Sequence, residues 1–272
     1  MPLPYYRLLG HCVVAAHALP EGSELPQALA KAGLPKTDIT RVGELAEKAE
    51  ELVEEKLDAV GEDRIHEHGV HAHVEELEMW MQTVRFRLRK AIDDDARIAQ
   101  ITGAHIHAEE HVATAAARAL RAIASLRVDE EVTDALGTRQ TVRDLLMRGQ
   151  SLLAKVFKAT EIRLAPEDDR DAEVFERLEA HRTAMTDWLL AVDAAARKVP
   201  AKDSRLLGRL GYVPEDVGIP VGGSSYAVVL HERGQTDPPD PSEAKPCTGW
   251  SVGRQGRNRE NLGKGFLVPE FD

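Results

Sequence analysis

The chain has 272 residues, of which 43% are hydrophobic and 30% are charged, and its net charge is −11. This length and composition are typical of a soluble globular protein with one or two domains. The acidic balance argues against a general nucleic-acid binder, because such proteins present basic surfaces.

The longest apolar run near the start covers residues 12–16, which is too short to span a bilayer. No basic segment precedes it as in a signal peptide. The two cysteines, Cys12 and Cys247, are too few for a disulfide framework. We therefore expect a cytoplasmic protein with free thiols and no membrane contact.

Residues 1–36 are rich in proline and glycine. Within them, residues 8–17 form a short apolar segment with β-branched Val13 and Val14 at its centre. This pattern favours a strand, because β-branched residues are enriched in strands. The sequence therefore predicts a non-helical N-terminal arm that contains one short strand.

Residues 37–199 are predicted to be helical, because no proline occurs between Pro35 and Pro166. Proline costs about 3 kcal/mol inside a helix, so a proline-free stretch can hold long helices. Apolar residues recur at helical spacing in five segments: about 37–60, 70–88, 112–126, 142–160 and 174–199. Each apolar face must be buried, which predicts an all-α antiparallel bundle of four or five long helices with coiled-coil-like packing.

Two details of this bundle concern its second and third helices. A new helix could start at the aspartates, with Asp93, Asp94 or Asp95 as its cap. Alternatively, a helix could end at Gly103. If the chain reverses at the aspartates, His111 should lie opposite residue 78. The third helix carries many alanines, which would let a neighbouring helix approach closely.

Residues 200–272 are again rich in proline and glycine, and they are predicted to form a C-terminal arm. A strand-like segment at 226–231 could pair with residues 8–17 as a small two-stranded sheet. Further on, the arm has a basic cluster and an apolar end at residues 266–271. The cluster consists of Arg254, Arg257, Arg259 and Lys264. The first predicted helix is strongly acidic. We therefore expect the basic C-terminal arm to dock on an acidic face such as that of this helix, within one chain or between chains.

Histidine is concentrated between His66 and His111, in two clusters with carboxylates nearby. Histidine is the commonest metal ligand, so these clusters are the candidate metal site. On a helix the useful pair is His107 and His111, with Glu110 or the first cluster completing the site. The candidate ligands are His107, His111, Glu110, His71 and His73. The alternatives are surface histidines and a pH-responsive interface, and His181 is expected to be a core histidine with one hydrogen bond.

No catalytic motif is present, since the phosphate-loop, nucleophile-elbow, zincin and di-iron spacings all fail. The sequence therefore favours a non-enzymatic interaction or assembly protein, which binds a protein partner or a second copy through its arms and needs no cofactor. The alternative is a histidine-rich helical bundle that binds a divalent transition metal for storage or sensing.

Overall fold

The computed structural model describes residues 3–20, 24–60, 69–165, 172–215 and 217, together with residues 227–228 and 245–246. The chain divides into two compact units, Met1–Val221 and Gly222–Asp272. Helices make up the first unit, so the protein is all-α as predicted. Within the described residues, no helix is long and apolar enough to cross a membrane.

The five helices predicted from apolar periodicity are present with similar bounds. They are α3 (Lys36–Val60), α4 (Val70–Leu88), α6 (His111–Val128), α8 (Arg139–Leu164) and α9 (Ala172–Ala196). Neighbours in this set run antiparallel. Glu76 and Trp80 of α4 contact Lys155 and Leu145 of α8, so chain positions rise on one helix as they fall on the other. Asp38 and Glu55 of α3 likewise meet Trp188 and Arg177 of α9.

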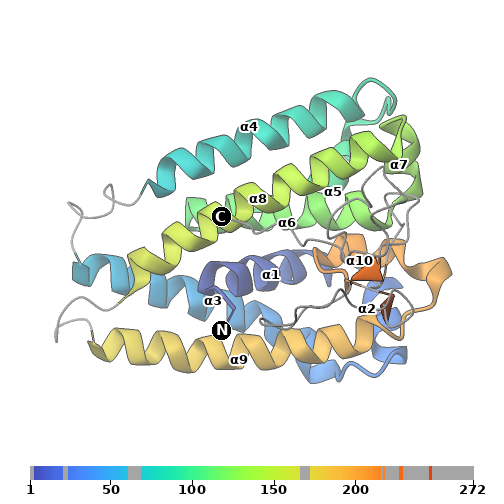
Figure 1. The fold of residues 1–272 in the computed structure, drawn as a ribbon. Helices are drawn as coiled ribbons and strands as arrows, with labels where there is room; N and C mark the ends of the chain where they lie inside the picture. The colour runs from blue at the N-terminus through green and yellow to red at the C-terminus, as the bar shows by residue number, and fades with distance from the viewer. Residues whose placement is uncertain are drawn as a thin grey trace, which may run out of the picture. The chain divides into compact units, whose positions relative to one another are not determined.

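The prediction of a strand at residues 8–17 is wrong, because these residues belong to α1 (Tyr5–Ala18). This helix lies at the centre of the unit and packs against α3, α6, α8, α9 and α10 (Figure 1). Most of its residues are buried, so it has no polar face and no helical alternation of apolar and polar residues. The missing alternation explains the misassignment.

The N-terminal arm is therefore part of the helical unit, and further short helices complete it. These are α2 (Glu24–Lys31), α5 (Asp95–Thr102), α7 (Glu130–Ala135), the 3₁₀ helix η2 (Ala201–Asp203) and α10 (Arg205–Leu210). The predicted C-terminal arm began too early, since η2 and α10 belong to the first unit and α10 packs on α6. The described residues thus form ten α-helices rather than four or five.

Both alternatives for the joint between α4 and α6 occur. Asp94 caps α5 by accepting the amides of Ala96 and Arg97, and Gly103 ends it in the left-handed conformation with φ 63°. The chain therefore folds back, and His111 of α6 lies opposite Glu78 of α4, with Nε2 3.6 Å from Oε1. This placement confirms the register predicted for a chain reversal at the aspartates.

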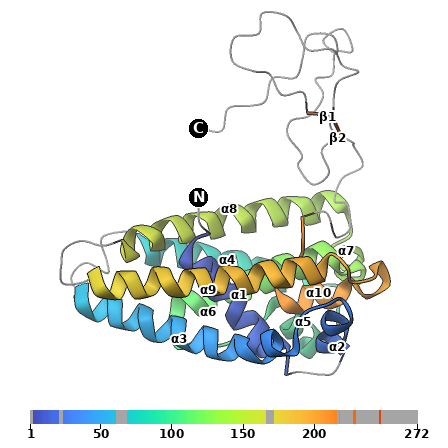
Figure 2. The same cartoon turned by 90° about the horizontal axis from the view of Figure 1, so that it is seen from below.

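Close helix contacts depend on small residues, as predicted for α6. Ala113, Ala116 and Ala117 of α6 are fully buried. A Cβ atom on Gly10 of α1 would lie only 2.9 Å from Cδ1 of Leu120. The two central helices therefore approach as closely as their side chains allow. The views in Figure 1 and Figure 2 show α1 enclosed by its neighbours.

In the second unit, β1 (Ala227–Val228) pairs antiparallel with β2 (Lys245–Pro246). Residues 227–228 fall within the segment predicted as a strand. Its predicted partner was wrong, because residues 8–17 are helical. The basic cluster and the apolar C-terminal segment lie outside the described residues.

Glycine substitutions should test the packing of α4 on α8. A Cβ atom on Gly149 would lie 2.8 Å from Cε2 and Cη2 of Trp80, whereas a Cβ on Gly43 of α3 meets nothing within 4 Å. We expect Gly149→Ala to lower the free energy of unfolding by about 1–3 kcal/mol through overpacking. Gly43→Ala should raise it by roughly 0.5–1 kcal/mol through helix propensity. Urea unfolding of both variants measures the difference, and equal effects would contradict the packing.

Candidate functional site

The predicted helical pair of His107 and His111 is not on one helix. The helix α6 begins at His111, and Glu110 is its N-cap, so His107 lies in the preceding loop. The Glu110 carboxylate accepts the Ala113 amide at 2.7 Å and lies 3.7 Å from a guanidinium nitrogen of Arg163. Burial raises the pKa of this carboxyl, although its hydrogen bonds oppose that shift. Glu110 thus has a structural role at the start of α6.

His107 is held by its neighbours in the fold. A guanidinium nitrogen of Arg118 donates to its Nδ1 at 3.2 Å, and His17 Nε2 donates to its carbonyl oxygen at 2.8 Å. Arg118 Nε also donates to the Ile106 carbonyl. These contacts fix the loop against α1 and α6 and occupy one of the two ring nitrogens.

The remaining candidate ligands lie on α4. The ring of His71 pairs with Glu75 at 3.1 Å, one turn along the same helix, and His73 is half-buried. Among the described residues, no three histidine, cysteine or acidic side chains lie close enough to hold a metal ion. His66 and His68 lie outside the described residues, so metal binding by the first cluster stays a prediction. His181 donates from Nε2 to the Leu45 carbonyl at 2.9 Å, as predicted, but the residue is half-buried rather than part of the core.

Charged side chains also reach the interior, at the start of α1. The Tyr5 amide donates to Glu161 Oε1 at 2.6 Å, and Arg182 donates to Glu161 Oε2 at 2.8 Å. Arg182 also contacts the Leu3 carbonyl at 3.4 Å. An acidic group at the N-terminus of a helix satisfies its free amides and its dipole. This network anchors α1 inside the bundle, and its residues have a structural explanation.

A second polar cluster joins α1, α9 and the segment after α10. Tyr212 donates to Asp193 Oδ1, and Arg197 donates to Asp193 Oδ2 at 2.8 Å. Burial would raise the pKa of Asp193, but these hydrogen bonds hold it below its usual value. The ring of His11 stands edge-on to that of Tyr212, with centroids 5.4 Å apart. Burial, helped by the nearby Arg7 charge, lowers the pKa of His11 to about 3.

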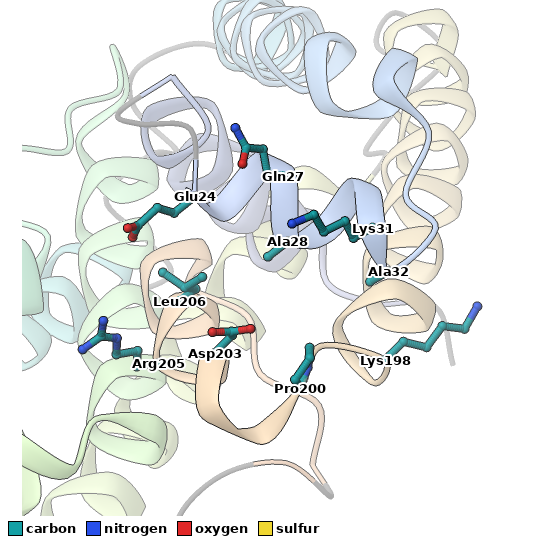
Figure 3. Close-up of a pocket in the computed structure, with 10 residues that line it drawn as sticks. All are labelled: Glu24, Gln27, Ala28, Lys31, Ala32, Lys198, Pro200, Asp203, Arg205 and Leu206. Carbon is teal, nitrogen blue, oxygen red and sulfur yellow. The ribbon is translucent and has the colours of Figure 1, made fainter.

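A pocket of about 380 Å³ lies between α2, the end of α9, η2 and α10 (Figure 3). Ala28, Ala32 and Leu206 supply its apolar lining. Its charged groups are mixed, with Glu24 and Asp203 against Lys31, Lys198 and Arg205. Figure 3 shows Lys198 extending away from the hollow. Because acids and bases nearly balance, the pocket favours neither an anion nor a cation.

The outer face of α4 carries the clearest unexplained feature of the described surface. The helix buries Val74, Leu77 and Val84 on its inner face, against α6 and α8. On its outer face, Met79 is 59% exposed and Phe86 is 62% exposed. In Figure 1 the helix runs along the edge of the helical unit. Large apolar side chains at this level of exposure gain only part of their burial energy from the fold of the single chain.

Met79 and Phe86 lie two helical turns apart, and the residues between and beside them complete a continuous stripe. Thr83 donates its hydroxyl to the Met79 carbonyl at 3.0 Å. Lys90 Nζ lies over the Phe86 ring, 4.5 Å from its centroid. With exposed Glu75 at the other end, we call Glu75, Met79, Thr83, Phe86 and Lys90 the α4 stripe. Helical periodicity did not predict this stripe, although Met79 and Phe86 lie seven residues apart in the sequence.

No protein family, curated protein or solved structure matches this chain. Its function therefore has to be inferred from its own residues. Among the described residues the large exposed apolar side chains are Met79, Phe86, Met147, Ile162 and Leu190, and Met79 and Phe86 lie two turns apart on one helix.

Replacing His11 should change how stability depends on pH. The folded-state pKa of about 3 lies below the usual 6.5, so the unfolded chain binds the proton first as the pH falls. Above about pH 6.5, protonation of His11 therefore has no effect on the free energy of unfolding. Between about pH 6.5 and pH 3, it lowers this free energy by about 1.4 kcal/mol for each unit by which the pH falls. We expect His11→Gln to flatten this loss in urea unfolding between pH 7.5 and 4. An unchanged slope would show that other groups dominate.

Proposed function

We propose that this protein is a non-enzymatic helical-bundle interaction or assembly protein, and that it binds protein through the α4 stripe. The observation that carries the proposal is the exposure of Met79 and Phe86 on one face of an edge helix. Burying two such side chains against a partner would contribute several kcal/mol at about 1.5–3 kcal/mol each. Apolar side chains at helical spacing are the usual anchors for a helix of a partner protein.

The stripe also has the chemical variety that a specific interface needs. Phe86 supplies an aromatic anchor, and aromatic residues are enriched at the energetic centres of interfaces. Charged residues of opposite sign lie at its two ends, Glu75 before Met79 and Lys90 beyond Phe86. Charges at the rim of an apolar centre select the partner and its orientation rather than adding much affinity.

The C-terminal arm remains part of this proposal. Its basic cluster and apolar end could add a second contact to an assembly that the α4 stripe begins. The N-terminal residues cannot serve as an arm, because α1 fills the centre of the bundle.

A photo-cross-linking amino acid placed at Met79 tests the proposal in cells that express the full chain. We expect a cross-linked protein product that Phe86→Asp removes, since a charge at the centre of the stripe should prevent docking. Leu190 of α9 is the matched control, because it is also 62% exposed and lies on another helix. Leu190→Asp should leave the product unchanged, and a cross-linker at Leu190 should give none.

The proposal fails if position 79 gives no protein product, or if the product persists in Phe86→Asp. It also fails if Leu190→Asp has the same effect as Phe86→Asp, because the loss would then reflect general destabilisation.

A further inference from the structure

The charges along α4 change sign about the midpoint of the α4 stripe, which lies between Gln82 and Thr83. The first half carries acids, Glu75, Glu76 and Glu78, and no basic side chain other than histidine. Residues 83–90 carry only bases, Arg85, Arg87, Arg89 and Lys90, before the aspartates at 93–95. A helix whose two halves have opposite charge is complementary to a second copy of itself in the opposite direction.

The α4 stripe obeys the same symmetry, position by position. Met79 and Phe86 lie equally far from the midpoint, on either side of it. Glu75 and Lys90 also lie equally far from it. If two α4 helices pair antiparallel about a two-fold axis through this midpoint, Met79 meets Phe86 of the second copy, and Glu75 meets Lys90.

Resting on the proposed function, we propose that the partner of the α4 stripe is a second copy of this chain. The two copies form a homodimer in which the α4 helices pack antiparallel. Such an interface is isologous, so every contact occurs twice. The α4 stripe of one chain therefore contains both members of each pair, Met79 with Phe86 and Glu75 with Lys90. Binding to a protein of different sequence would not need this internal symmetry.

The same charges argue against a parallel pairing. In register, a parallel arrangement would place Glu75 against Glu75 and Lys90 against Lys90, and like charges repel. The antiparallel arrangement converts both repulsions into attractions. The charge pattern thus determines the direction of the helices, while Met79 and Phe86 provide the apolar contact.

The existing partners of two of these charges present little obstacle, whereas Lys90 has to leave the Phe86 ring of its own chain, over which its Nζ lies 4.5 Å from the centroid. Glu75 pairs with His71 at 3.1 Å and Arg89 with Asp95 at 3.1 Å, and all four side chains are more than 60% exposed. Exposed ion pairs contribute little to stability, so exchanging them for contacts across the dimer costs little. Thr83, close to the two-fold axis, already satisfies its hydroxyl within its own helix. It can therefore be buried without leaving a hydroxyl unpaired.

The expected affinity follows from the size of the contact. Paired about this axis, the two α4 helices overlap only over residues 77–88, which is about 18 Å at 1.5 Å per residue. An overlap of this length buries less area than a standard stable interface, which places the dimer among weak, transient associations. We therefore expect a dissociation constant in the micromolar range and an exchange between monomer and dimer that depends on concentration.

Charge reversal on the full chain tests the direction and the register together. Analytical ultracentrifugation measures the dimer dissociation constant of wild type, Glu75→Lys, Lys90→Glu and the double variant. Each single change creates two repulsive contacts per dimer, so we expect each to raise the dissociation constant about tenfold or more. The double variant restores both pairs with reversed sign and should return to within about threefold of wild type.

Mixing the two single variants gives a further test. In a heterodimer of Glu75→Lys with Lys90→Glu, one chain carries two lysines at these positions and the other carries two glutamates. Both cross-pairs are then attractive, so the mixture should associate more tightly than either variant alone. Circular dichroism and a thermal unfolding curve for each variant establish that the helices remain folded.

Phe86→Asp should abolish the dimer, while the equally exposed Leu190→Asp should not change it. The inference is overturned if wild type stays monomeric up to roughly 1 mM, if the charge reversals have no effect, or if the double variant fails to recover. These failures differ from failure of the proposed function, in which position 79 cross-links to no protein at all. A monomeric chain that cross-links to a different protein would overturn only the homodimer.

Discussion

The burial of α1 on every side is the constraint on which the rest of this structure depends. A helix at the centre of a bundle has no face for water, so nearly all its side chains must be apolar or satisfied locally. Its first amide is satisfied by Glu161, which Arg182 holds in turn. The contact with α6 is close because Gly10 meets a surface of small side chains, including Ala116. The neighbouring helix α6 is buried almost as completely, whereas α3, α8 and α9 each bury one face and leave the other to solvent.

This arrangement explains which features of the chain are structural. The polar residues that reach inside anchor helix ends or loops: Glu110 starts α6, Arg118 holds the preceding loop, and the Trp80 ring nitrogen donates to the Leu145 carbonyl at 3.1 Å. The cluster of Asp193, Arg197 and Tyr212 ties α9 to the segment after α10. Once these roles are assigned, the α4 stripe stands out, because Met79 and Phe86 remain mostly exposed two turns apart on one helix.

The candidate histidine site shows where sequence reasoning reached its limit. The pairing of His111 with the position opposite it on α4 followed from helix length and the aspartate turn, and Glu78 is found there. The pairing of His107 with His111 assumed that the helix began earlier than it does. Glu110 is the N-cap of α6, so the helix begins at His111. His107 therefore lies in the loop before α6. Caps are set by a few hydrogen bonds, so periodicity alone could not place them.

The sequence by itself determined the all-α class and five helices, because proline is absent between Pro35 and Pro166 and apolar residues recur at helical spacing in each of the five segments. It also contained the opposite charges in the two halves of α4 and the spacing of Met79 and Phe86. Only the tertiary structure decided that residues 5–18 form a helix, since a segment buried all round has no periodic pattern to read. The apolar period of residues 70–88 already included Val84 and left Phe86 outside it. Only the structure shows that α6 and α8 cover the face that carries Val84 and leave Phe86 62% exposed.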